Sequence, residues 1–287
     1  FMIENNGYGL STPTSEQYAC RDLVDRAKGY GIRGDLIDGN DILAVIDSVE
    51  RAAEHSRKGN GPTLIEAKTF RMRGHEEASG TKYVPQDLFD EWVKQDPILR
   101  FEKSLSTNKW FNEKFVTDID IEIKNLVNPA IDFAVEANIP KSTELDELND
   151  VFFIEEIDRK NPSKNLTSLR FVDAIKEGLS QKMEADESII LMGQDIAEYG
   201  GIFKISEGFV EKFGKSRVRN TPIIESGIIG AAMGLALEGY KPVVEMQFAD
   251  FVSCGFNQIV NNLAKTYYRW NSPLNVTLRM PCGGELS

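Results

Sequence analysis

The stretch Asn220-Thr221-Pro222-Ile223-Ile224-Glu225-Ser226-Gly227 gives the clearest indication of the fold of this chain. The residues that follow it are apolar or glycine and carry no charge until Glu238, which predicts a buried helix. Glu225 therefore lies between a proline-containing turn and the start of an apolar helix. A carboxylate in that position meets little water and is suited to share a proton with a ligand. The alternative is a charge that only stabilises the N-terminus of the helix.

Apolar segments of strand length lie on both sides of this stretch. Segments without polar alternation are typical of parallel strands that helices cover on both faces. Helical patterns separate these segments, and the first helix is expected to begin at Thr167 or Ser168. Residues 166–287 are therefore predicted to form an α/β domain. The predicted strands are residues 188–193, 242–248 and 275–280, and the predicted helices include residues 208–213 and 251–270.

The first part of the chain shows the same alternation. Asn40 or Asp41 caps an amphipathic helix, which ends at Gly59-Asn60-Gly61-Pro62. A second covered, mainly parallel-sheet domain is predicted over residues 1–137. Its other predicted helices are residues 15–28, 85–105 and 112–137, and its predicted strands are residues 1–3, 32–37 and 63–70.

Residues 138–165 are predicted to link the two domains. This segment is polar and irregular, with Pro140, Pro162 and several acidic residues, and only residues 151–154 are apolar. Such a composition is typical of a domain boundary. A chain of 287 residues is also long enough for about two domains.

The charge and the cysteine content argue against several classes of protein. A net charge of -12 would not attract nucleic acid or an anionic membrane surface. Cys20, Cys254 and Cys282 lie far apart without metal-ligand spacing, so we expect free thiols and a cytoplasmic protein. No uncharged stretch reaches membrane-spanning length. Both ends of the chain lie beside strand-like runs, from which we expect an internal segment of a longer protein with both domains incomplete.

Two loops carry residues suited to ligand binding. The first, residues 4–9, follows the first strand, at the edge where open α/β sheets bind ligands. The amide oxygen of Asn6 and a backbone carbonyl are hard ligands that suit magnesium, and the alternative is an asparagine turn with glycine at positive φ. The second loop, residues 71–80, follows another strand and holds His75, for which catalysis and an ordinary surface position are the two alternatives.

Both halves of the chain resemble one enzyme family, the thiamine-diphosphate-dependent 2-oxo acid dehydrogenases. The first half is similar to their α subunit through Glu4-Asn5-Asn6-Gly7-Tyr8, Ser11-Thr12-Pro13, Asp38-Gly39-Asn40-Asp41 and Arg73-Gly74-His75. The second half is similar to their β subunit through residues 193–201, Thr221-Pro222-Ile223-Ile224-Glu225 and Phe248-Ala249-Asp250-Phe251. The resemblance implies the thiamine-diphosphate-binding fold in a single chain that fuses the two subunits. Residues 1–137 would be the C-terminal part of a diphosphate-binding domain, and residues 166–287 the N-terminal part of an aminopyrimidine-binding domain, with the cofactor between them.

The resemblance also implies roles for individual residues. Asn6 and the carbonyl of Tyr8 would bind magnesium, which carries the diphosphate. Glu225 would form a hydrogen bond with the aminopyrimidine ring, and His75 would lie near the reacting carbon. The residues expected to line the aminopyrimidine ring in branched-chain members are Ile223, Gln247 and Phe251.

The implied activity is the oxidative decarboxylation of a branched-chain 2-oxo acid of the 2-oxoisovalerate type. The acyl group would pass to the lipoyl group of a partner acyltransferase, and the fused chains would form a homodimer. Residues 11–18 and 245–250 are similar to branched-chain members in particular. The alternatives are a pyruvate dehydrogenase component, a transketolase-like thiamine enzyme, and a catalytically silent fragment that acts only in assembly.

The chain departs from the family pattern at several places. An acidic metal-ligand motif of the α subunit would precede Phe1, and a β-subunit histidine would follow Ser287. Gln194 stands where many relatives carry glutamate, which puts an acid role there in doubt. Glu76 stands where animal relatives carry a phosphorylated serine, so that form of control is not expected.

Overall fold

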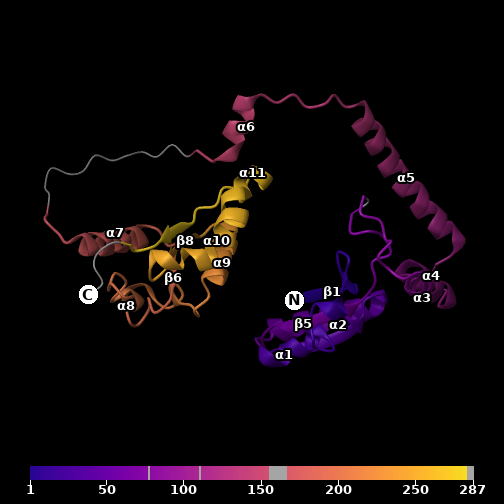
Figure 1. The fold of residues 1–287 in the computed structure, drawn as a ribbon, viewed down its shortest axis with the longest axis horizontal. Helices are drawn as coiled ribbons and strands as arrows, with labels where there is room; N and C mark the ends of the chain where they lie inside the picture. Colours follow the sequence, from indigo (N-terminus) through magenta and orange to yellow (C-terminus); the bar gives the residue numbers. More distant parts are fainter. Residues whose placement is uncertain (77, 110, 155–166, 283–287) are drawn as a thin grey trace. The chain divides into compact units, whose positions relative to one another are not determined.

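A computed structural model of the chain describes residues 1–76, 78–109, 111–154 and 167–282. The chain divides into two compact units, Phe1–Asn138 and Ile139–Ser287, each of which has its own sheet (Figure 1). Both larger sheets are parallel and carry helices, so the predicted α/β class is confirmed. Across the described ranges, no helix is both long and apolar enough to cross a membrane.

The main sheet of the first unit has three strands in the order β1-β5-β4. Their bounds are β1 Met2–Asn5, β4 Arg33–Asp38 and β5 Thr63–Lys68. Lys68 is in register with both Asn5 and Asp38, so the three strands end level. The loops that leave this edge therefore start together, at the edge of a parallel sheet where ligands bind.

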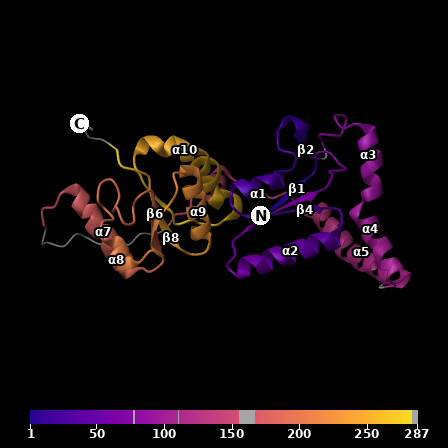
Figure 2. The same cartoon turned by 90° about the horizontal axis from the view of Figure 1, so that it is seen from below.

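Helices cover both faces of this sheet. Helix α2, Ile42–Arg57, lies on one face, where the Ser48 hydroxyl donates to Asp35 on β4 at 3.1 Å. Helix α1, Arg26–Gly29, and the 3-10 helix before it lie on the other face, against Gly34. Neighbouring residues of a strand point to opposite faces, so α1 and α2 flank the sheet, as Figure 2 shows. The predicted cap of α2 is Asp41, whose carboxylate accepts from two amides of the first turn.

The prediction of one helix over residues 15–28 is wrong. The chain instead forms two 3-10 helices, Thr14–Glu16 and Leu23–Asp25, and then the short α1. Asp22 is extended, with φ -129° and ψ 144°, and shares a capping box with Asp25, so that a new helix begins there. Before this segment, β2 Tyr8–Gly9 and β3 Thr12–Pro13 form a small antiparallel hairpin.

The helix predicted over residues 85–105 is divided into α3 Gln86–Trp92, the 3-10 helix Val93–Gln95 and α4 Pro97–Thr107. Pro97 disfavours helical geometry in the residue before it, and Asp96 has ψ 124°. The Asp96 carboxylate then accepts from the amides of Ile98 and Leu99, which begins α4. Proline and its preceding cap therefore end one helix and start the next.

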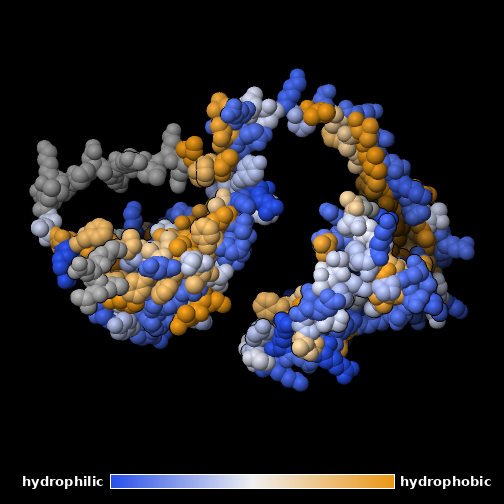
Figure 3. Space-filling view, viewed as in Figure 1, coloured by the Kyte–Doolittle hydropathy of each residue, from blue (hydrophilic) through white to orange (hydrophobic). Residues whose placement is uncertain are grey.

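Helix α5, Glu113–Glu136, agrees closely with the helix predicted over residues 112–137. Asn112 caps it by accepting from the Phe115 amide at 3.0 Å. Apolar side chains run along this helix in Figure 3. Leu126 and Phe133 are among its exposed residues.

The sheet of the second unit has four parallel strands in the order β7-β6-β8-β9. Their bounds are β6 Ile189–Gly193, β7 Val218–Asn220, β8 Lys241–Glu245 and β9 Thr277–Arg279. Gly193 is in register with both Asn220 and Glu245, so the carboxyl ends of β6, β7 and β8 lie level. The segments that follow β7 and β8 carry the residues predicted for the second unit's site.

Two hydrophobic clusters cover the two faces of β6. Leu191 packs with helices α7 Phe171–Ala185 and α8 Phe209–Phe213. Met192, the next residue, packs with helix α9 Glu225–Leu237 and with β8. The fully apolar strand predicted here is confirmed, since all five residues of β6 are buried.

Several predicted details of the second unit differ in the structure. Helix α7 begins at Phe171, because Arg170 is extended at its N-terminus and pairs with Asp173. The linker predicted over residues 138–165 is described only as far as residue 154, and there helix α6 Glu144–Val151 forms with a capping box between Thr143 and Asp146. The rest of that predicted linker lies outside the described residues. Helix α9 is only partly buried within this chain, with three fully buried residues.

The single helix predicted over residues 251–270 is also divided. The segments are the 3-10 helix Ala249–Phe251, α10 Val252–Asn257, a π turn Gln258–Asn262, a 3-10 helix Leu263–Lys265 and α11 Thr266–Trp270. The Thr266 hydroxyl donates to the Asn262 carbonyl at 2.7 Å, a local side-chain bond that competes with regular helix geometry.

Candidate functional site

The loop after β1 is held by two successive asparagine turns. Asn5 Oδ1 accepts from the Gly7 amide at 3.3 Å, and Asn6 Oδ1 accepts from the Tyr8 amide at 3.1 Å. Gly7 has φ +84°, which a residue with a side chain rarely adopts. The asparagine turn considered as the alternative for Asn6 is therefore present. It is compatible with metal binding, because an amide oxygen has a second lone pair.

The Tyr8 side chain packs into an aromatic group next to this loop. Its ring lies edge-on to Phe70, with centroids 6.5 Å apart, and tilted against Tyr83 at 6.0 Å. A pocket of about 320 Å³ opens beside it at the carboxyl edge of the sheet. The residues that line this pocket include Asn6, Tyr8, Lys68, Phe70 and Trp92.

A buried polar cluster lies directly under this loop. Glu66, in the middle of β5, is fully buried, and its carboxylate pairs with Lys68 at 2.7 Å. Burial raises the pKa of Glu66, but hydrogen bonds from Lys68, Asn5 and the Val24 amide outweigh it, so the pKa is lowered. Burial likewise lowers the pKa of Lys68, and its pairing with Glu66 and Asp22 more than reverses this. The pair is therefore ionised around neutral pH.

His75 is exposed on the loop that follows β5. Its Nδ1 lies 3.4 Å from Arg71 Nη1. Arg71 also donates to the Leu10 carbonyl at 2.6 Å and to the Tyr83 hydroxyl at 3.2 Å. Arg71 thus joins the His75 loop to the hairpin that carries Tyr8. Three of the predicted site residues, Asn6, Tyr8 and His75, therefore lie on loops that leave the same carboxyl edge of the sheet.

In the second unit, Glu225 is the first residue of α9 and is half-buried. Its Oε1 accepts from Gln194 Nε2 at 3.2 Å, and Gln194 itself is buried at the end of β6. Among the described residues, Glu225 Oε2 makes no hydrogen bond or ion pair. One carboxylate oxygen is thus fixed by the protein, and the other is open to a donor from a ligand.

The remaining predicted residues of this unit lie on neighbouring loops. Gln247, after β8, donates to Asp195 Oδ2 at 3.3 Å, and Asp195 directly follows Gln194. Phe251 lies edge-on to Phe248, with centroids 5.9 Å apart. Ile223 is 84% exposed. Glu225 and Gln247 are thus linked to adjacent residues of one loop, whereas Ile223 packs little against the rest of the described unit.

The loop that carries Gln194 and Asp195 is tightly fixed. Gly201 has φ +73°, and a Cβ placed on it would lie 3.0 Å from Glu245 Oε1. Glu245 is 3% exposed and forms a buried ion pair with Arg279 on β9. The buried Ser206 hydroxyl closes the loop by donating to the Ile196 carbonyl at 2.6 Å. Rigid support of this kind suits a loop that orients Glu225.

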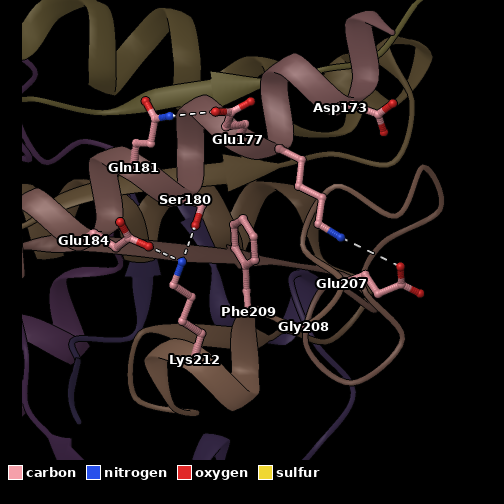
Figure 4. A pocket seen from close by; sticks show the side chains of 10 residues that line it. Asp173, Glu177, Ser180, Gln181, Glu184, Glu207, Gly208, Phe209 and Lys212 are labelled. Atoms are coloured by element: carbon pink, nitrogen blue, oxygen red, sulfur yellow. Dashed lines mark hydrogen bonds and ion pairs between the residues drawn. The ribbon is translucent and has the colours of Figure 1, made fainter. Parts of the chain in front are cut away.

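A larger pocket of about 490 Å³ lies between α7 and α8 (Figure 4). Its charged side chains are occupied with one another. Lys212 contacts both Glu184 and Ser180, and the Lys176 amine lies 3.8 Å from Glu207. This pocket is lined by helix surfaces instead of the loops at the strand ends, so its volume alone does not make it the site.

The donor groups fit a magnesium ion and thiamine diphosphate in part. Within the described ranges, no group of three or more histidine, cysteine, aspartate or glutamate side chains could hold a metal. The oxygens of Asn6 and Tyr8 are nevertheless of the type that magnesium prefers. The Glu225 carboxylate is ionisable and could accept a hydrogen bond from a nitrogen of a heterocyclic ring. The available groups therefore suit a metal whose other ligands come from phosphate oxygens, water or residues outside this set.

Sequence reasoning missed three residues that support the site: Asn5, Glu66 and Gln194. The signal for Glu66 was a charge between the apolar Ile65 and Ala67 of a strand, since buried charges are rare unless paired. For Gln194 the sequence shows only that a glutamine stands where many members of the similar family carry glutamate. Its hydrogen bond with Glu225 depends on the packing of α9 against the β6 edge, which spacing along the chain does not reveal.

Two family models match the chain, one in each half. Residues 1–143 match the dehydrogenase E1 component, and residues 167–286 match the pyrimidine-binding domain of transketolase. The predicted thiamine-diphosphate-binding fold, with parallel α/β sheets, is therefore confirmed.

Similar proteins match less than half of the chain. It is 43% identical over 127 residues to the pyruvate dehydrogenase E1 component subunit beta of Leifsonia xyli subsp. xyli, which covers 44% of this chain and 38% of the relative. It is 41% identical over 126 residues to the 2-oxoisovalerate dehydrogenase subunit beta of Pseudomonas aeruginosa, with coverages of 43% and 36%. The corresponding Bacillus subtilis subunit is 39% identical over 123 residues, with coverages of 42% and 37%.

The chain thus spans less than two fifths of the length of these relatives. The chain is therefore similar to the dehydrogenase E1 component and to the transketolase pyrimidine-binding domain in its two halves, and to β subunits of pyruvate and 2-oxoisovalerate dehydrogenases over less than half of its length.

Proposed function

We propose that this protein catalyses the oxidative decarboxylation of a branched-chain 2-oxo acid of the 2-oxoisovalerate type. It transfers the acyl group to the lipoyl group of a partner acyltransferase. In this proposal α-like and β-like parts are fused in one chain, two copies of which form a homodimer in the cytoplasm.

One observation carries the proposal. Two oxygens that could ligate a metal, Asn6 Oδ1 and the Tyr8 carbonyl, follow β1 in the unit matched by the E1 model. A carboxylate oxygen of Glu225 without a protein partner among the described residues follows β7 in the unit matched by the pyrimidine-binding model. Both groups lie at the carboxyl ends of parallel strands, where α/β sheets bind cofactors. The two halves therefore offer the two kinds of contact that the two ends of thiamine diphosphate require.

The residues of the first unit would bind the charged end of the cofactor. Asn6 Oδ1 and the Tyr8 carbonyl would hold a magnesium ion bound to diphosphate oxygens. When bound, thiamine diphosphate supplies the nucleophilic carbon and the electron sink for loss of carbon dioxide. Neither Asn6 nor Tyr8 carries a charge that attracts phosphate, so the metal is needed for binding.

Glu225 would hold and release a proton at a nitrogen of the aminopyrimidine ring. Gln194 occupies one oxygen of the carboxylate and thereby orients the other toward the ligand. Ile223, Gln247 and Phe251 would line the ring. A fixed carboxylate of this kind typically contributes about 10²–10⁴-fold to a proton-transfer step.

His75 would provide a proton during acyl transfer. An arginine side chain can only donate hydrogen bonds, so in the neutral ring the contact with Arg71 would favour the tautomer with Nδ1 as the acceptor and the hydrogen on Nε2. The Nε2–H of the neutral ring would donate a hydrogen bond to a sulfur of the lipoyl ring. To pass a proton to that sulfur, the ring would first take up a proton from solvent at Nδ1 and leave its contact with Arg71.

Pyruvate is the alternative substrate. It is favoured by a specific observation, since a pyruvate dehydrogenase β subunit and a 2-oxoisovalerate dehydrogenase β subunit are similar to this chain to nearly the same extent, 43% and 41% identity. One or two methyl groups in an apolar pocket change discrimination by only about 1–3 kcal/mol, so activity on both acids is expected. A catalytically silent assembly protein is the alternative outside enzymes.

Calorimetry with thiamine diphosphate separates the enzyme from the silent protein. The protein expressed from its complete gene is titrated in magnesium and again in excess chelator. We expect saturable binding only with the metal. Equal affinity in chelator would contradict the roles of Asn6 and Tyr8, and absence of binding in both conditions would favour the silent assembly protein.

A further inference from the structure

Glu66 is a buried carboxylate for which the proposed reaction has no use. It lies on the central strand β5 and is fully buried. Its Oε1 accepts from Asn5 Nδ2 at 2.6 Å and pairs with the Lys68 amine at 2.7 Å, while its Oε2 accepts from the Val24 amide at 2.7 Å. Both oxygens are thus engaged by donors from three different segments.

Asn5 connects this carboxylate to the loop that carries Asn6 and Tyr8, the residues proposed to bind the metal. Its side-chain nitrogen donates to Glu66 and to the Tyr18 hydroxyl, the latter at 2.9 Å. Its side-chain oxygen accepts from the Gly7 amide, and its backbone carbonyl accepts from the Thr69 amide at 3.0 Å. Both side-chain donors of Asn5 are therefore used to hold its amide, and its side-chain oxygen fixes the turn over residues 5–7.

The turn fixed by Asn5 determines where Asn6 and Tyr8 lie. Gly7 needs positive φ to reverse the chain, and the next asparagine turn, from Asn6 to the Tyr8 amide, begins inside the first. If the Asn5 amide could rotate, the Gly7 amide would lose its acceptor and both turns could open.

We infer that Glu66 is a positioning residue: it locks the Asn5 amide, and through it the turn that directs the Asn6 oxygen and the Tyr8 carbonyl toward one divalent cation. This inference rests on the proposed function for the role of the cation. The locking of the turn itself follows from contacts within the first unit.

A purely structural role is the competing explanation. Lys68 lines the pocket beside Asn6, and its amine also pairs with Asp22 at 3.0 Å. Glu66 would then serve only to neutralise a partly buried ammonium group, because an unpaired buried charge is strongly destabilising. The two explanations predict different behaviour when both charges are removed together.

Glu66→Gln alone and the double variant Glu66→Gln with Lys68→Met make this comparison. A glutamine at position 66 keeps one acceptor oxygen but turns the other into a donor, so it cannot serve both Asn5 and the Val24 amide. The double variant leaves no unpaired ammonium group, which protects the fold. Asp35→Asn is the matched control, because Asp35 is a mostly buried carboxylate on the adjacent strand that pairs with Arg33 and Arg51, away from the loop.

The first measurement is hydrogen exchange at the Gly7 and Tyr8 amides without cofactor or metal. We expect exchange about tenfold faster in both the single and the double variant, and at the wild-type rate in Asp35→Asn. The second measurement is the magnesium concentration for half-maximal binding of thiamine diphosphate, which should rise about tenfold in the same two variants.

Restoration of wild-type exchange and metal dependence in the double variant would overturn the inference, since Glu66 would then only neutralise Lys68. If the wild-type protein shows no metal-dependent binding of thiamine diphosphate, the proposed function fails. The exchange rates still decide in that case whether Glu66 locks the turn, so the two failures can be told apart.

Discussion

Replacing Glu225 with glutamine tests whether this carboxylate works on a proton or only stabilises a helix. The change keeps the side-chain size and an oxygen that can still accept from Gln194 at about the observed geometry, 3.2 Å. Only the ionisable group is removed.

The cost in stability follows from two contacts. A hydrogen bond to a charged group contributes about 1.5–3 kcal/mol and a neutral one about 0.5–1.5 kcal/mol, so about 1 kcal/mol is lost at Gln194. The negative charge at the N-terminus of α9 contributes a further 0.3–1 kcal/mol or so. The free energy of unfolding should therefore fall by about 1–2 kcal/mol, and cofactor affinity should change little.

Proton transfer should fall far more. Loss of a positioned acid–base group reduces the rate of a proton-transfer step by about 10²–10⁴-fold. NMR measurement of cofactor proton exchange in the complex with magnesium and thiamine diphosphate reports this step directly. Glu238→Gln, at the opposite end of α9, is the matched control and should exchange at the wild-type rate. An exchange rate within about threefold of wild type in Glu225→Gln would show that Glu225 is only a helix charge.

Three further perturbations have defined outcomes. In His75→Ala, acyl transfer to a lipoyl domain should fall at least tenfold more than reduction of an artificial electron acceptor, and equal losses would place His75 earlier in the reaction. Gly201→Ala should lower the free energy of unfolding by about 1–3 kcal/mol in urea titrations, because φ +73° is strained for alanine and the new Cβ would press on a buried carboxylate. Gly239 has φ +86° but open space around it, so Gly239→Ala should lower the free energy of unfolding only by the backbone strain, about 1–2 kcal/mol. An equal loss of stability in the two variants would contradict a contact with the buried carboxylate. The Glu66–Lys68 pair should contribute stability between about pH 4.5 and 10.5 and lose it below, as the lowered pKa of Glu66 is passed, and above, as the raised pKa of Lys68 is passed. Unfolding titrations of wild type and of the double variant should converge at both extremes.

The strands could be predicted because their apolar runs are a local signal. Residues 188–193 are apolar enough to require burial on two faces, and β6 lies inside its sheet with all five of its residues buried. The cap of α2 was equally local, since Asp41 accepts from amides two and three residues later. Such features do not depend on the rest of the fold.

Helix ends were predicted less well where two signals compete. The run over residues 85–105 has helical periodicity, but Pro97 overrides it. The capping box at Thr143 outweighed the polar composition that predicted an irregular linker. Composition over a wide window hides a cap that acts over four residues.

The candidate site residues could be proposed from the sequence because Asn6 and His75 lie in loops at strand ends and Glu225 begins the helix that follows β7. Their partners were not visible, since each comes from a distant segment. Glu66 supports the loop after β1 from a position 61 residues later than Asn5, and Gln194 contacts Glu225 across 31 residues. The register of β1 and β5 brings Asn5 and Glu66 together, and the packing of α9 against the end of β6 brings Glu225 to Gln194.

The most direct test of the central claim is carbon dioxide release from 2-oxoisovalerate labelled at its carboxyl carbon. The protein expressed from its complete gene is assayed with magnesium, thiamine diphosphate and an artificial electron acceptor, and pyruvate is assayed in parallel. We predict cofactor-dependent release from both acids, with the larger kcat/KM for 2-oxoisovalerate. A clear excess for pyruvate would replace the proposed substrate, and no cofactor-dependent release from either acid would contradict the claim that this protein is a 2-oxo acid dehydrogenase.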